Sequence, residues 1–261
     1  MVEIREEHAE ASGSRSTGFS NSRAQRTGFT QYLCSNPINS VLWFLRGVTI
    51  VCGLMFVFPL GLNKYSAYQK TLLSAAATNA LRLHQRVGRI QFNMSFLQNT
   101  FCEDSFHYLL YCMILLSVQP MTLGLATVVL FALLHWCNFF VNLMQASHFG
   151  HTALCQATDT FIKKHMQTIL HLAACCEIFL LPVIVSLTLY GKCNIIAPFI
   201  YYRFITMRYS SRRNPRTRLA FQELRATAEY VANHRACPSL LRKAIYQLIR
   251  LVNWLAPPPV H

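Results

Sequence analysis

The longest stretch without a formal charge most limits how this chain can fold. Residues 105–158, between Asp104 and Asp159, contain no Asp, Glu, Lys or Arg. A soluble domain does not easily accommodate such a run, because a helix or strand of the run would turn an apolar side to water. The run therefore predicts a membrane protein.

The overall composition agrees with a membrane protein and adds a basic tail. Hydrophobic residues make up 53% of the chain and charged residues 13%, about half the charged share of an ordinary soluble domain. The net charge is +14, and most of this excess lies in residues 203–261. A basic segment attracts anionic lipid headgroups or nucleic acid. Residues 1–31 are polar and rich in Ser, Gly and Arg, which predicts a disordered tail and no signal peptide.

Four apolar segments define a predicted membrane domain, residues 32–206. They are 41–62, 106–119, 121–144 and 166–190. About 20 apolar residues cross a hydrocarbon core, so the first and last segments are long enough to span. Trp43 is placed to anchor the first segment at the interface, and Arg46 is near enough to its end to reach the headgroups.

The central apolar run is too long for one crossing helix. Gln119-Pro120 interrupts it, because proline breaks a helix interior, and this predicts a helical hairpin with a short first leg and a long second one. Residues 64–104 are amphipathic and predict a helix on the membrane surface or against the bundle. The predicted fold class is all-α: a multi-pass helical membrane protein with a central helical hairpin and amphipathic interfacial helices.

A cluster of arginines follows the membrane domain. It consists of Arg203, Arg208, Arg212, Arg213, Arg216 and Arg218. Basic residues next to a membrane segment remain on the cytosolic side, so we expect the cluster to lie on an anionic leaflet. Its position beside apolar residues 194–202, with Tyr201 and Tyr202 expected at headgroup level, disfavours nucleic acid as the partner.

The tail, residues 207–261, predicts two amphipathic helices. The first begins at Asn214-Pro215, a favourable helix start. The second, within residues 237–258, has one broad apolar face and a basic opposite side. Two interpretations remain open: it packs on the protein's own cytosolic face, or it lies in the membrane interface. The residues assigned to this interfacial helix are Leu241, Arg242, Lys243, Ile245, Leu248, Ile249, Arg250, Val252 and Trp254.

The side of the membrane on which the N-terminus lies stays open. If the central run crosses twice, the N-terminus is cytosolic and the loop 64–104 is lumenal; a single crossing reverses both. The basic residues of the loop oppose a lumenal position, although the length of the central run favours two legs and both termini in the cytosol. Asn93 stands in an N-glycosylation acceptor pattern that bears on this question.

Glu177 is the residue in the spans most suited to chemistry, because an ionisable group in lipid is costly. We expect it to pair within the bundle or to lie near a helix end. Phosphate-loop, hydrolase and metal-ligand patterns are not found in the sequence, so we expect neither an enzyme nor a bound metal or cofactor. The scattered cysteines are expected to act as small apolar residues.

Several stretches resemble the transmembrane protein 33 family, which includes Krüppel homologue 2 and fungal pore-membrane proteins. They are "ALRLHQR" (80–86), "EDSFHYLLY" (103–111), "EIFLLP" (177–182), "PFIYYRFITMRYSSRRNP" (198–215) and "FQELR" (221–225). The resemblance extends over about residues 32–257, and the 198–215 string is its most specific part.

This resemblance implies a multi-pass protein of the endoplasmic reticulum and nuclear envelope. It implies a role in organising the tubular reticulum with reticulon-type proteins, and in the distribution or assembly of nuclear pores with pore components. It implies no enzymatic activity and no cofactor. Two other readings remain: a small channel or transporter, and an adaptor that presents its basic tail to protein partners.

Overall fold

The computed structural model describes residues 29–58, 63–87, 94–101, 103–147, 149–211, 215–235 and 237–256. Within these ranges every regular element is an α-helix, which confirms the predicted all-α class. Most of the predicted tail 1–31 lies outside the described residues, as do Asn93, Arg212 and Arg213.

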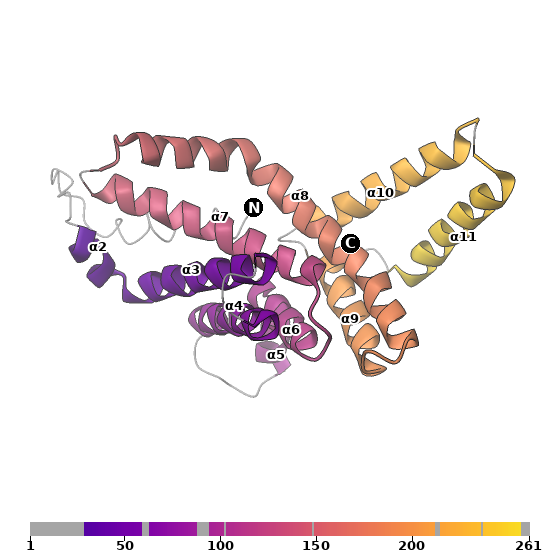
Figure 1. Cartoon of the computed structure of the whole chain (residues 1–261), viewed down its shortest axis with the longest axis horizontal. Coiled ribbons are helices and arrows are strands. Elements are labelled where there is room, and N and C mark those ends of the chain that lie inside the picture. The colour runs from indigo at the N-terminus through magenta and orange to yellow at the C-terminus, as the bar shows by residue number, and fades with distance from the viewer. Residues whose placement is uncertain are drawn as a thin grey trace.

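Among the described residues, three helices are long and apolar enough to cross a membrane: α3 (Pro37–Val57), α7 (Thr122–Ala146) and α8 (Ala153–Leu189). They coincide with the predicted segments 41–62, 121–144 and 166–190. The last helix begins earlier than predicted, because its polar start is also helical and carries an Asp159–Lys163 ion pair one turn apart. Figure 1 shows that α8 bends along its length.

Apolar side chains point outward from two of these helices, α3 and α8. Phe44, Val51 and Leu54 of α3 and Phe179 of α8 are exposed. In a soluble protein such a surface would face water at a cost, whereas in a bilayer it faces acyl chains that are equally apolar. The exposed side chains therefore fit helices that are surrounded by lipid.

The predicted break in the central run is present. Helix α6 (Asp104–Leu116) ends before Pro120, and α7 begins at Thr122. The two helices meet at the turn, where Tyr111 donates a hydrogen bond to the Gly124 carbonyl at 2.9 Å. A Cβ at Gly124 would lie 2.9 Å from Leu115 Cδ1, so a larger residue there would displace the Leu115 side chain. Beyond the turn the helices separate: α6 packs on α4 (Lys64–Val87) and α9 (Ile196–Ser210), and α7 packs on α3 and α8.

The sequence allowed two positions for the amphipathic segment 64–104, on the membrane surface or against the bundle. In the structure, helix α4 packs against the bundle. Tyr68 and Leu72 are fully buried on its inner side. The Tyr68 hydroxyl donates a hydrogen bond to the Leu115 carbonyl at 3.2 Å, and burial raises the pKa of Tyr68, so this donor stays protonated. The hydroxyls of Thr49 and Ser74 join α3 to α4 at 2.8 Å.

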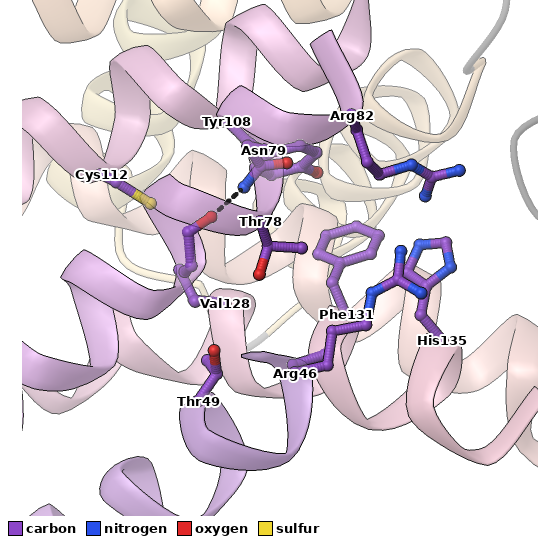
Figure 2. Close-up of a pocket in the computed structure, with 12 residues that line it drawn as sticks. Arg46, Thr49, Thr78, Asn79, Arg82, Tyr108, Cys112, Val128, Phe131 and His135 are labelled. Atoms are coloured by element: carbon purple, nitrogen blue, oxygen red, sulfur yellow. Dashed lines mark hydrogen bonds between the residues drawn. The ribbon is translucent and has the colours of Figure 1, made fainter. Parts of the chain in front are cut away.

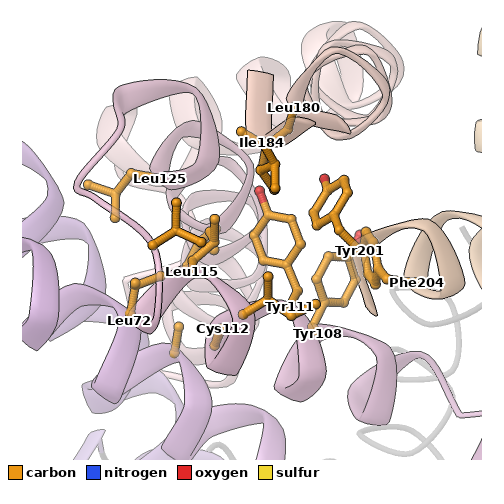
Figure 3. Close-up of a cluster of buried hydrophobic side chains, with 14 of the residues drawn as sticks. Leu72, Tyr108, Tyr111, Cys112, Leu115, Leu125, Leu180, Ile184, Tyr201 and Phe204 are labelled. Carbon is orange, nitrogen blue, oxygen red and sulfur yellow. The ribbon is translucent and has the colours of Figure 1, made fainter. Parts of the chain in front are cut away.

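The main core is formed by residues of α4, α6, α7, α8 and α9, and the rings of Tyr111, Tyr201 and Phe204 lie together within it (Figure 3). The ring centres of Tyr111 and Phe204 are 5.1 Å apart, and those of Tyr201 and Phe204 are 5.3 Å apart. Tyr201 was expected at headgroup level, but it is fully buried in this core. The expectation was wrong because the short apolar segment 194–202 is the first part of a longer helix that packs on the bundle.

The remaining helices are peripheral. They are α2 (Phe29–Ser35), α5 (Met94–Phe101), α10 (Arg216–Asn233) and α11 (Ser239–Leu255). Helix α10 begins directly after Pro215, as the sequence predicts. Figure 1 shows α10 and α11 as a pair that extends away from the other helices at one end of the molecule.

Candidate functional site: a buried arginine network and an exposed C-terminal helix

Arg208 lies inside the protein. Its residue surface is 1% exposed, so its assignment to a membrane-surface cluster was wrong. Its Nη1 lies 3.2 Å from Asp104 Oδ1, its Nε lies 3.5 Å from Glu177 Oε2, and its Nη2 donates to the Tyr108 hydroxyl at 2.7 Å. One guanidinium thus faces two buried carboxylates.

Arg208 and its partners lie on three helices. Asp104 and Tyr108 are one turn apart on α6, Glu177 is on α8, and Arg208 is on α9. The Tyr108 hydroxyl also donates to Glu177 Oε1 at 2.7 Å, and the Tyr201 hydroxyl donates to the Glu177 carbonyl at 2.9 Å. The expectation that Glu177 pairs within the bundle is met in this network, which ties the three helices together.

A periodic signal for the burial of Arg208 was present in the sequence. Tyr201, Phe204, Ile205 and Arg208 follow the spacing of one helix face, and all four are buried. The arginine was grouped with its basic neighbours because their charge density is the more obvious feature. Its acidic partners are distant in the sequence, so charge pattern alone did not connect them.

The other arginines of the cluster have different environments. Arg203 is exposed on α9. Arg216 donates a hydrogen bond to the Gln167 side chain, and Arg218 donates to the Ser211 carbonyl at 3.5 Å. The described part of the cluster is therefore divided between core and surface.

We expect Glu177→Gln to be tolerated. The substitution preserves side-chain size and one hydrogen-bond acceptor, and it leaves Asp104 to balance Arg208. The loss of one charged hydrogen bond should cost about 1–2 kcal/mol of unfolding free energy, measured by SDS titration of the protein in mixed micelles. Cellular localisation should not change. A channel or proton relay would need the charge, so an ion flux that disappears in this variant at normal expression would contradict a structural role.

Helix α11 presents its apolar side to the exterior. None of its residues is buried, and Leu248 and Trp254 are 59% and 79% exposed. Leu241 and Val252 are also exposed, whereas Ile245 and Ile249 are half-buried. The apolar face is thus largely uncovered by the described part of the chain.

Two residues of the polar side of α11 form hydrogen bonds with the end of α10. Arg242 donates to the Ala232 carbonyl at 2.9 Å, and the Tyr246 hydroxyl donates to the Asn233 side chain at 3.0 Å. Lys243 and Arg250 are exposed. A helix that packs on its own protein normally turns its apolar face inward, so this orientation favours the membrane-interface interpretation.

The described residues contain no cluster of three or more His, Cys, Asp or Glu that could hold a metal ion. The network of Arg208 holds its carboxylates by hydrogen bonds from an arginine and a tyrosine. Such an arrangement joins the helices, and the carboxylates already accept hydrogen bonds from within the protein. We therefore assign the network to structure and regard the exposed face of α11 as the candidate site of interaction.

The three candidate spans, the exposed apolar side chains of α3 and α8 and the exposed amphipathic helix α11 define a multi-pass helical membrane protein. A family model described as Transmembrane protein 33/Nucleoporin POM33 matches residues 21–258. The chain therefore belongs to this family, as the quoted stretches indicated.

Curated relatives align over nearly the whole chain. Human Transmembrane protein 33 is 39% identical over 235 residues, which cover 89% of this chain and 95% of the relative. The Transmembrane protein 33 homolog of Caenorhabditis elegans is 38% identical, and the alignment covers 89% of this chain and 86% of the relative. Krueppel homolog 2 of Drosophila melanogaster is 37% identical, with coverage of 87% and 82%. No solved structure matches the chain.

Proposed function

We propose that this protein is a non-enzymatic membrane protein of the endoplasmic reticulum and nuclear envelope. In this proposal it helps to organise the tubular reticulum and the distribution or assembly of nuclear pores. Membership of the Transmembrane protein 33/Nucleoporin POM33 family supports the location and the link to the pore. Reticulon-type proteins and pore components are the proposed protein partners, and nucleic acid is not a proposed partner.

The outward apolar face of α11 carries the proposal. An amphipathic helix that enters one leaflet takes up area there and not in the opposite leaflet, which favours a curved bilayer. Leu241, Leu248 and Val252 are exposed and share this face. Lys243 and Arg250 are exposed at the polar side, where they favour anionic headgroups.

The proposed orientation places the tail in the cytosol. Arg203, Arg216 and Arg218 lie close to the end of the membrane domain, and basic residues in such positions favour the cytosolic side. The anionic lipids of a cytosolic leaflet would then be within reach of α11.

The network around Glu177 supports a structural role over transport. A transport path needs polar groups that exchange partners with the transported ion. Glu177 is fully buried, and a tyrosine and an arginine donate to its two carboxylate oxygens. This arrangement favours a fixed junction between helices.

Imaging of the full chain, tagged at its N-terminus, tests the proposed function. We expect the protein in reticulum tubules and at the nuclear rim. In cells depleted of the endogenous protein, the wild-type chain should restore the tubular network and the pore distribution. A chain that ends at residue 236 should reach the same membranes but restore them poorly, because it lacks α11. Localisation to the plasma membrane, or full rescue by the shortened chain, would contradict the proposal.

A further inference from the structure

Helix α9 lies beside the last part of α8 and runs in the opposite direction (Figure 1). Near the start of α9, Tyr201 donates a hydrogen bond to the Glu177 carbonyl, and further along Arg208 contacts the Glu177 side chain. Arg216, the first residue of α10, donates to the Gln167 side chain. The chain has therefore returned, by Arg216, to the level at which the apolar part of α8 begins.

A tight polar turn joins the two helices. Gly191 follows α8 with a φ of 67°, a left-handed conformation that glycine adopts without strain. The Asn194 side chain accepts a hydrogen bond at 3.1 Å from the backbone N–H of Ile196, where α9 begins. Lys192 and Asn194 are exposed. Such a turn is suited to headgroups and water, because a charged group in the hydrocarbon core is costly.

Both helices carry apolar side chains on their outer surfaces near this turn. Phe179 and Leu189 of α8 and Ile196 and Phe199 of α9 are exposed. Phe199 is 67% exposed although it belongs to a helix whose other side lies in the core. Acyl chains are as apolar as these side chains, so α9 has a surface suited to lipid, as α8 has.

The two arginines of α9 are compatible with a position in the membrane. Arg208 is buried and faces the Asp104 and Glu177 carboxylates. Arg203 is exposed about two turns before the end of the helix, and a long arginine side chain in such a position extends to the headgroups.

A second arginine of the membrane domain is buried in a similar way. Arg46 was expected to extend to the headgroups from the end of its helix, but its residue surface is only 5% exposed. Figure 2 shows it with Arg82 and His135 at the wall of a small cavity between α3, α4, α6 and α7. An arginine in this domain is therefore not by itself a sign of the membrane surface.

The basic residues on either side of the α8–α9 pair also favour a return. Lys163 and Lys164 are exposed in α8 before its apolar part, and Arg216 and Arg218 follow α9. A return through α9 places these four residues on one side of the membrane, as the bias of basic residues toward the cytosol favours. A single crossing by α8 would place the two lysines opposite the arginines.

We infer that α8 and α9 form a hairpin that crosses the membrane twice. Helix α8 crosses, the turn at residues 190–195 lies on the far side, and α9 leads the chain back, so the C-terminal tail lies on the side where α8 begins. Helix α9 is 15 residues and about 22 Å long, and the contact of Arg216 with Gln167 completes the return. The inference concerns relative sides only, so it does not depend on the proposed cytosolic position of the tail.

Inserts that report their side of the membrane test the hairpin. A flexible insert with an N-glycosylation acceptor and a specific protease site is placed after His151, after Lys192 or after His261 in the full chain, with Asn93→Gln to remove the native acceptor pattern. In sealed microsomes we expect the Lys192 insert to be glycosylated and protected from the protease. The inserts after His151 and His261 should be cleaved and carry no glycan.

Each other result has a defined meaning. If the inserts after His151 and His261 lie on opposite sides, α9 does not return and the hairpin is wrong. If all three lie on one side, α8 does not cross, which also overturns it. If all three positions are reversed, the hairpin is supported and the cytosolic position of the tail in the proposed function is contradicted.

A point substitution tests the turn if the Lys192 insert prevents folding. Lys192→Cys does not lengthen the turn and adds one exposed thiol. A membrane-impermeant maleimide should label this thiol only after the microsomes are permeabilised, with the wild-type chain as the blank for the native cysteines. Labelling above that blank in sealed microsomes, with the tail also accessible, would overturn the hairpin.

Discussion

Arg208→Ala should lower the free energy of unfolding by about 3–5 kcal/mol, the usual cost of breaking a buried ion pair by removing one partner. The substitution leaves the Asp104 and Glu177 carboxylates buried without their cation. It also removes the hydrogen bonds by which the Arg208 side chain joins α9 to α6 and α8. SDS titration in mixed micelles, followed by circular dichroism, measures the change.

Arg203→Ala is the matched control for this prediction. It removes the same side chain from the same helix at an exposed position, and surface substitutions usually change stability by no more than about 0.5 kcal/mol. Adding Asp104→Asn and Glu177→Gln to Arg208→Ala should recover part of the loss, because the unpaired charges disappear. Equal effects of Arg208→Ala and Arg203→Ala would show that the network does not stabilise the fold.

Leu248→Asp with Val252→Asp should abolish membrane binding by the C-terminal helices. The segment to test is residues 215–261, because α9 packs in the core and α10 begins at Arg216. We expect this segment to be mostly disordered in buffer and helical on small anionic vesicles. Burial of a Leu or Val side chain contributes about 1.5–3 kcal/mol, so the two substitutions should weaken binding at least 100-fold.

A charge-matched control separates the apolar face from overall charge. Gln247→Glu with Asn253→Asp adds the same two negative charges outside the apolar face and should weaken vesicle binding far less. Higher salt should weaken the wild-type interaction, since it screens Lys243 and Arg250. If the wild-type segment gains no helix on anionic vesicles by circular dichroism, α11 is not a membrane-binding helix.

Periodicity and chain length predicted the helices themselves. The uncharged run 105–158 required apolar surroundings, Pro120 required a break, and Pro215 marked the start of α10. Each of these signals is local, because it depends on residues within one helix or one turn. The amphipathic pattern of α11 is local in the same way, and most of its predicted apolar face is exposed in the structure, although Ile245 and Ile249 are half-buried.

The positions of the charged residues depended on tertiary structure. In the sequence, Arg208 has basic neighbours and Arg46 lies near the end of an apolar segment. Both positions therefore predicted contact with lipid headgroups. Arg208 is buried because Asp104 and Glu177 on two other helices face it, and Arg46 is buried where α4 and α7 pack on α3. A helix pattern shows which side chains share a face, but only the packed structure shows what that face meets.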